Sequence, residues 1–133
     1  MKIASFLLNL TSENPERLIA FYRDTLGLEP NPDIGEGAFN IGNGTVLHID
    51  GHSDTHGMTR EPQRVLIDFF VEDAEAEQAA LKARGVRFIR ELGVEYWGGI
   101  ISTFADPDGN YLQIIQFDPT KATEQPATAE ATA

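Results

Sequence analysis

The stretch "TFADPDGNYLQIIQF" at residues 103–117 repeats the pattern of "AFNIGNGTVLHIDGH" at residues 38–52. In each, a Phe precedes a glycine-bearing turn, and the turn leads into a short run of alternating apolar residues typical of a β-strand. Four pairs are separated by the same 65 positions: Phe39 and Phe104, Gly44 and Gly109, Leu47 and Leu112, and Ile49 and Ile114. One such match can arise by chance, but four at one offset indicate two copies of one structural unit.

The residues before these two stretches follow the same order of elements. Residues 2–10 are predicted to form a strand, and a helix follows with Asn14 as N-cap, Pro15 at the first position and Gly27 at its end. The second half starts with a strand at 64–71 and a helix that Asp73 caps and Gly85 ends. Further strands are predicted at 28–30, 37–41 and 45–50, and at 86–90, 96–105 and 111–117. Leu10 would align with Val71, which is an offset of 61 for the first strands.

Each half therefore reads strand, helix and three strands, which predicts one α+β domain over residues 1–117. Module 1 covers residues 1–51, a polar linker covers 52–62, and module 2 covers 63–117. Residues 118–133 are rich in Ala, Thr, Glu and Pro, so we expect a disordered tail.

Composition excludes several classes of function. The 133 residues carry a net charge of −11, which disfavours binding to nucleic acid or to anionic membrane surfaces. No apolar run reaches the roughly 18 residues of a membrane-spanning helix. The chain has no Cys, which removes disulfides and thiolate ligands and fits the reducing cytoplasm, where we expect the protein.

Two motifs carry a family resemblance. "FYRDTLGLEP" at 21–30 and "DPDGNYLQI" at 106–114 resemble the vicinal oxygen chelate superfamily, which includes glyoxalase I, bleomycin-resistance proteins and extradiol dioxygenases. The resemblance covers residues 1–117 and implies two βαβββ modules whose mixed β-sheet curls into a cup. It also implies a homodimer, because modules of this family commonly assemble across two chains.

The resemblance places the metal-ligand positions of the family's enzymes at Ser5, His48, Leu66 and Gln113. Leu66 has no donor atom and the Ser5 hydroxyl is a weak one, whereas a divalent ion needs three or four good donors. If the first strand is aligned two residues further on, Leu7 replaces Ser5. We therefore predict no bound cofactor or metal, with His48 and Gln113 as the ligands if a divalent ion does bind.

Strand alternation adds further side chains to the expected cup. Asp50 would lie on the same side as His48, and Asp68 on the same side as Leu66, so both carboxylates stay open as metal donors outside the family pattern. The predicted ligand-binding residues are polar or aromatic side chains of both modules: Ser5, Asn9, His48, Asp50, Asp68, Phe70, Trp97 and Gln113.

Two of these residues have alternative interpretations. Trp97 precedes two glycines, so it can stack on a ligand at the rim of the cup or pack over the sheet edge. Asp68 lies in an apolar strand, where it is either a partly desolvated carboxylate with a raised pKa or a group paired with Arg or His48.

Other motifs are assigned to loops. His48, His52 and His56 have the four-residue spacing of helical metal ligands, but the glycines around them argue against a helix, so His52 and His56 are predicted to be solvated. "DPDGN" is predicted to be a turn, because a calcium loop would need Glu where Phe117 stands.

We therefore predict a glyoxalase-like or bleomycin-resistance-like protein that binds a small organic ligand in its cup without metal. The acidic side chains Asp50 and Asp68 favour a cationic or polyhydroxyl ligand. The alternative is a metal-dependent lyase, isomerase or dioxygenase of the same superfamily, and no residue is assigned a catalytic role.

Overall fold

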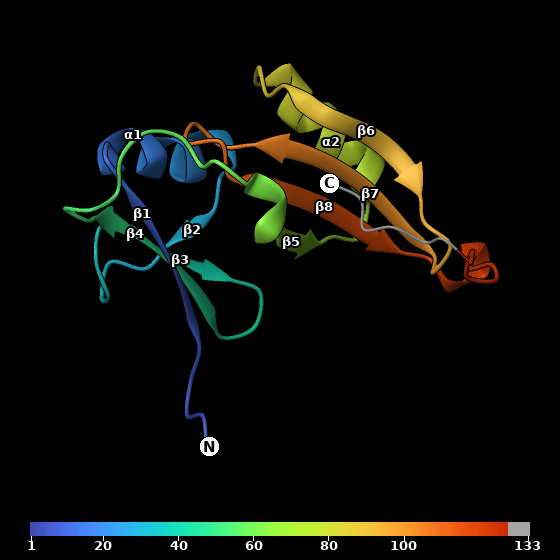
Figure 1. Cartoon of the computed structure of the whole chain (residues 1–133), viewed down its shortest axis with the longest axis horizontal. Helices are drawn as coiled ribbons and strands as arrows, with labels where there is room; N and C mark the ends of the chain where they lie inside the picture. The colour runs from blue at the N-terminus through green and yellow to red at the C-terminus, as the bar shows by residue number, and fades with distance from the viewer. Residues whose placement is uncertain (128–133) are drawn as a thin grey trace. The chain divides into compact units, whose positions relative to one another are not determined.

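The computed structural model describes residues 1–127, which form two compact units (Figure 1). Unit 1 is Met1–Met58 and unit 2 begins at Thr59, so the division falls inside the predicted linker. Each unit contains a four-stranded mixed sheet and one α-helix. The predicted α+β class with two βαβββ modules is confirmed.

Unit 1 contains β1 (Leu7–Ser12), α1 (Pro15–Ala20), β2 (Glu29–Pro30), β3 (Ala38–Ile41) and β4 (Thr45–Gly51). A π-helical turn at Phe21–Thr25 continues α1. The strand order is β1-β4-β3-β2, in which β1 runs parallel to β4 and the other neighbours are antiparallel.

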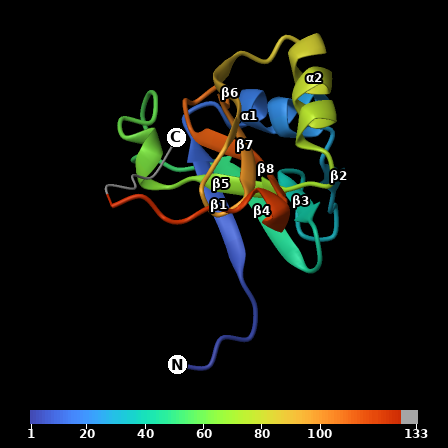
Figure 2. The same ribbon diagram turned by 90° about the vertical axis from the view of Figure 1, so that its right-hand side faces the viewer.

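Unit 2 contains β5 (Ile67–Phe70), α2 (Ala74–Ala83), β6 (Phe88–Val94), β7 (Gly99–Ala105) and β8 (Tyr111–Phe117), together with 3₁₀ turns at Pro62–Arg64 and Pro119–Lys121. Its strand order, β5-β8-β7-β6 with β5 parallel to β8, reproduces that of unit 1 (Figure 2).

The sequence repeat is a repeat of core positions. Phe39 and Phe104 are both buried, as are the pairs Leu47 with Leu112 and Ile49 with Ile114. Gly44 and Gly109 both have positive φ, at 87° and 83°, which glycine adopts without strain. The chain therefore repeats the side chains that fill each core and the glycines that turn into each last strand.

The helix starts follow the predicted caps. The side chain of Asn14 accepts from the Arg17 amide at 3.2 Å, and that of Asp73 accepts from the Ala76 amide at 3.0 Å. The first helical segment ends just before Gly27, which has a φ of 70°, as predicted; it is α-helical only to Ala20, because a Leu26 N to Phe21 O bond of 2.9 Å widens the next turn.

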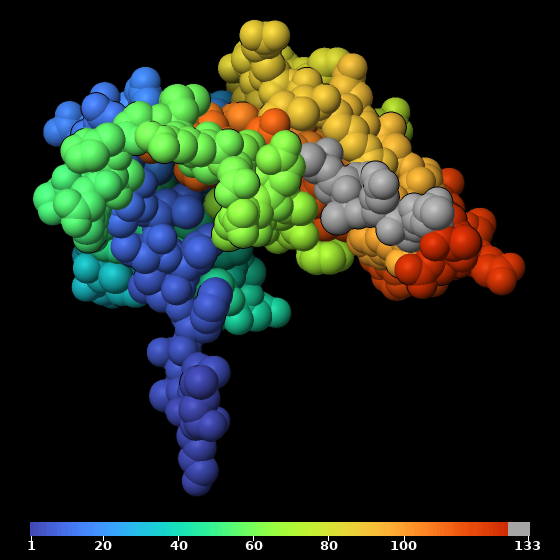
Figure 3. Space-filling model, in the orientation of Figure 1, coloured from blue at the N-terminus to red at the C-terminus, as the bar shows by residue number. Residues whose placement is uncertain are grey.

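The first strand differs from the prediction in start and register. β1 begins at Leu7, and residues 1–6 are exposed and belong to no strand; they project from unit 1 in dark blue in Figure 3. Leu8 pairs with Leu47 and Ile67 with Leu112, so the offset of the first strands is 59 and the predicted 61 was wrong. Both faces of the segment "KIASFLLNL" are apolar, so the side-chain pattern alone does not fix its register.

The predicted tail begins with ordered residues. Asp118 caps the turn Pro119–Lys121, and the Thr123 amide donates to the Tyr96 carbonyl at 2.6 Å. The end of that predicted tail, residues 128–133, lies outside the described residues. Among residues 1–127, no helix is long and apolar enough to span a membrane.

Candidate functional site

The two faces of the unit 1 sheet have different compositions. Leu47 and Ile49 of β4 point to the face that α1 covers, where Leu18 and Tyr22 are fully buried. The intervening residues of β4, His48 and Asp50, therefore point to the opposite face. Asn9 lies on that face too, because it pairs with His48 in the parallel register of β1 and β4.

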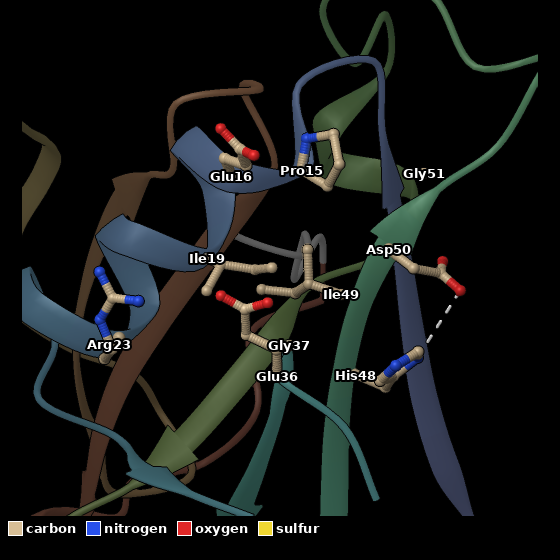
Figure 4. Close-up of a pocket in the computed structure, with 10 residues that line it drawn as sticks. All are labelled: Pro15, Glu16, Ile19, Arg23, Glu36, Gly37, His48, Ile49, Asp50 and Gly51. Carbon is tan, nitrogen blue, oxygen red and sulfur yellow. Dashed lines mark ion pairs between the residues drawn. The ribbon is translucent and has the colours of Figure 1, made fainter. Parts of the chain in front are cut away.

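These three side chains form a hydrogen-bonded cluster. His48 Nδ1 lies 2.6 Å from Asn9 Oδ1, and Asn9 Nδ2 donates to Asp50 Oδ1 at 3.3 Å. His48 Nδ1 also lies 3.9 Å from Asp50 Oδ2, the contact drawn as a dashed line in Figure 4. Three of the predicted ligand-binding residues thus lie together.

A cavity of about 520 Å³ adjoins this cluster, within the usual size range of small-molecule sites. Figure 4 shows α1 on one side of it and the end of β4 on the other, with Ile19 and Ile49 facing each other between them. The lining residues come from three segments: Pro15, Glu16, Ile19 and Arg23 from the first helical segment, Glu36 and Gly37 from the loop before β3, and His48–Gly51 from β4.

Gly37 allows that loop to form a cavity wall. The Ile49 amide donates to the Gly37 carbonyl at 2.8 Å, and a Cβ on Gly37 would lie 2.1 Å from the Ile49 carbonyl oxygen. Since no side chain fits there, only glycine lets the chain pass this close to β4.

Arg23, the cationic side chain of the lining, is paired. Its Nε and one terminal nitrogen donate to the two carboxylate oxygens of Asp24 at 2.8 and 2.9 Å. This hydrogen-bonded pair raises the pKa of Arg23 and lowers the pKa of Asp24.

The corresponding face of unit 2 is built differently. Gln113 is buried, and its Nε2 donates to Thr103 Oγ1 at 3.0 Å, so this amide is part of the packed sheet. Asp68 pairs with Gln113 in register and is exposed, yet desolvation by its surroundings raises the pKa of its carboxyl. Phe70, also on β5, is 66% exposed.

Trp97 packs at the edge of the unit 2 sheet. Its ring lies over Gly99, where a Cβ would come within 2.3 Å of the indole, and stacks on Phe117 with centroids 6.2 Å apart. Gly98 has a φ of 92°, and a Cβ there would lie 2.4 Å from the Asp118 carbonyl oxygen. The two glycines therefore position the Trp97 ring, and 36% of the residue stays exposed.

Other predicted positions do not join a cluster. Ser5 precedes β1 and is exposed, whereas Leu7, which replaces it in the alternative alignment, is the first residue of β1. Leu66 precedes β5. His52 and His56 are exposed between β4 and the 3₁₀ turn at Pro62, as predicted. "DPDGN" is a turn in which Asp106 Oδ1 accepts from the amides of Asp108 and Asn110 at 2.9 and 3.0 Å.

The donor set does not fit a metal centre. Within the described residues 1–127, no group of three or more His, Asp or Glu side chains is placed to hold an ion. Leu7 and Leu66 provide no donor, and the amide of Gln113 is engaged with Thr103. That the protein binds no metal stays a prediction.

The sequence did not reveal the helix side of the cavity. Glu16, Ile19, Arg23 and Glu36 line it, although none belongs to the repeated stretches. The one available signal was Glu36 between two glycines in "GEG". Glycines allow a close approach of the backbone to a neighbouring strand, and such an approach would carry the Glu36 side chain with it.

Comparison with known proteins gives a family. Residues 3–114 match the family model described as Glyoxalase/Bleomycin resistance protein/Dioxygenase superfamily. A protein of that superfamily from Nocardioides has a similar structure, with a TM-score of 0.65 and 17% identity over 99% of this chain and 91% of that one. An antibiotic binding protein from Streptomyces sp. CB03234 gives a TM-score of 0.65 and 23% identity over 89% of this chain and 99% of that one. At these identities the structures establish the fold alone, and no curated protein matches the sequence.

Proposed function

Because the chain belongs to the glyoxalase/bleomycin resistance protein/dioxygenase superfamily, we propose that it binds a small organic ligand without the metal ion of the family's enzymes. Fold alone does not determine function, so the proposal depends on the site. A fold relative, the Streptomyces antibiotic binding protein, supports it by analogy.

The observation that carries the proposal is the cavity of unit 1. Ile19 and Ile49 give it an apolar interior, and His48, Asp50 and Glu36 add a few polar groups at its edge. Apolar walls with a small number of converging polar groups are typical of ligand sites. The cluster of Asn9, His48 and Asp50 fixes the orientation of one of those groups in advance, which reduces the entropy lost on binding.

The chemistry of the family positions supports the metal-free part of the proposal. The first-strand positions are weak in either alignment, because Leu66 is aliphatic and its counterpart is Ser5 or Leu7, and a neutral amide bonded to Thr103 occupies a last-strand position. The alternative, a metal-dependent lyase, isomerase or dioxygenase, predicts a stoichiometric divalent ion in the purified protein.

We further propose that the protein is a cytoplasmic homodimer. Exposed apolar side chains support a second copy as partner: Ile3 is 72% and Phe6 67% exposed in the segment before β1. β1 is also an edge strand of its sheet, and an edge strand exposes backbone groups that can pair with another chain. Light scattering of the purified chain measures this directly, and a monomer at micromolar concentration would refute the dimer.

Two measurements test the proposed function. Amide chemical shifts recorded against a library of small organic compounds should change for cavity residues such as Ile19 and Ile49. Elemental analysis of the protein purified without chelator should give less than a stoichiometric amount of divalent metal. A stoichiometric ion that is lost in the His48→Ala variant would favour the metalloenzyme instead.

A further inference from the structure

We propose that the cavity of unit 1 selects ligands that carry a protonated amine on an apolar body. The inference rests on the proposed function, because it names the ligand class of the same cavity. It follows from the hydrogen-bonding roles of the lining side chains, which can be assigned one after another.

The orientation of Asn9 selects one tautomer of the neutral His48 ring. An ionised Asp50 carboxylate only accepts, so the amide nitrogen of Asn9 faces it at 3.3 Å and the amide oxygen faces His48. That oxygen also only accepts, so His48 Nδ1, 2.6 Å away, carries the proton. In the neutral ring, Nε2 is then left as an acceptor.

The Nε2 atom of His48 lies beside the loop that continues into the cavity wall. A Cβ on Gly35 would lie 3.7 Å from His48 Nε2, and Gly35 leads directly into Glu36 and Gly37, which line the cavity. Asp50 and Asn9 thus act as positioning residues that present Nε2 to a ligand.

The remaining polar side chains of the lining are mostly acceptors too. Glu16, Glu36 and Asp50 are carboxylates, which accept hydrogen bonds and carry negative charge. The cation of the lining, Arg23, has its charge balanced by the bidentate contact with Asp24. A bound carboxylate would therefore meet like charges, and a neutral alcohol would gain no charge attraction.

The apolar part of the ligand is set by the other lining side chains. Ile49 is 2% exposed and faces Ile19 across the cavity, as Figure 4 shows. A volume of about 520 Å³ accommodates a hydrocarbon chain or one ring beside the charged group. Acceptors and net negative charge around an apolar interior complement an organic ammonium.

The test compares three probes with one hydrocarbon chain: hexylammonium, hexanol and hexanoate. Each is titrated into the full chain while amide shifts are recorded, and Kd values are fitted from cavity residues. We expect hexylammonium to bind at least about tenfold more tightly than hexanol, as an added charge-assisted hydrogen bond predicts. We expect no shift with hexanoate.

The outcomes separate the two proposals. Equal or tighter binding of hexanol or hexanoate at the cavity would overturn the amine class and leave the proposed function standing. If none of the three probes binds, the amine class is also overturned. If, in addition, no compound of the library changes the amide shifts of the cavity residues, the proposed function is refuted as well.

Charge variants locate the selectivity. Glu36→Gln should weaken hexylammonium by about threefold to tenfold and leave hexanol unchanged, and because Glu36 is exposed this variant should fold. Glu77→Gln on α2 makes the same change in net charge outside the cavity lining and should have no effect. Equal weakening by both would show that the net charge of −11 attracts the ammonium, which would overturn selection by the cavity.

His48 is tested by two replacements. His48→Phe removes the acceptor at similar size and should weaken hexylammonium, whereas His48→Gln retains an acceptor and should recover part of the affinity. Loss of affinity of the same size in both would contradict the assigned role of Nε2.

Discussion

Two buried serines allow one substitution to be predicted with opposite signs. Ser12, at the end of β1, is 1% exposed, and its Oγ accepts from the Asn14 amide at 3.0 Å. Ser102, in β7, is 0% exposed, and its Oγ has no hydrogen-bond partner among residues 1–127. We expect Ser102→Ala to stabilise unit 2 and Ser12→Ala to destabilise unit 1.

The magnitudes follow from what each hydroxyl does in the folded state. A buried hydroxyl without a partner costs about 1–3 kcal/mol of desolvation, and removing one oxygen leaves a void worth a few tenths of a kcal/mol. Ser102→Ala should therefore raise the free energy of unfolding by about 1–2 kcal/mol. Ser12→Ala loses one hydrogen bond and leaves the Asn14 amide without it, which should lower that free energy by about 1 kcal/mol.

The assay must report on each unit separately, because the chain forms two compact units. Native-state hydrogen exchange, read by mass spectrometry for peptides of β7–β8 and of β1–β4, measures the opening free energy of each core. Destabilisation of unit 2 by Ser102→Ala, of the size expected for Ser12→Ala, would show that the Ser102 hydroxyl is satisfied and would refute the reasoning.

Two further predictions concern the faces of the sheets. Gly37→Ala places a Cβ 2.1 Å from the Ile49 carbonyl oxygen, and hydrogen exchange should show that the free energy of unfolding of unit 1 falls by about 2–3 kcal/mol. The control is Gly35→Ala, which should be tolerated because the nearest atom to its Cβ would be 3.7 Å away. Similar losses of stability in both variants would contradict the steric argument. The raised pKa of Asp68 means that its protonated form favours folding, so this contribution is present below pH 3.8 and is lost as the pH rises through the folded-state pKa. Asp68→Asn should therefore be more stable than the parent at neutral pH and equal to it in acid, and a pH-independent difference in urea unfolding would count against desolvation at this carboxyl.

The fold was predictable because its determinants are local and occur twice. Phe39 and Phe104, and the glycines that turn into β4 and β8, mark equivalent positions without knowledge of the tertiary structure. The caps Asn14 and Asp73 are recognisable because a side-chain oxygen just before a helix typically accepts a hydrogen bond from a backbone amide of the first turn. The start of β1 was not predictable, since Ile3 and Phe6 have the composition of a strand but no neighbour to pair with.

The site was predictable only where strand alternation determines it. A period of two places His48 and Asp50 on one face, and the parallel register adds Asn9. The opposite wall comes from α1 and from a close approach at Gly37, which depends on how the helix packs on β4. Packing of this kind leaves no periodic trace in the sequence, so Glu16, Ile19 and Arg23 were missed.

The two modules differ at the positions on either side of His48 and Gln113, and these differences account for the different hydrogen bonds of the two side chains. Thr103 pairs with Gln113 across β7 and β8, and Ala38 pairs with His48 across β3 and β4, so the two pairs are equivalent at the offset of 65. The Thr103 hydroxyl accepts from Gln113 and holds it in the packed sheet, whereas the Ala38 methyl group offers His48 no partner. His48 is bonded instead to Asn9 of β1 on its other side, and its Nε2 lies near Gly35 of the loop before β3. The two copies of the duplicated last strand thus hold their central polar side chains differently: Gln113 is bonded to Thr103 on the β7 side, and His48 is bonded to Asn9 on the β1 side.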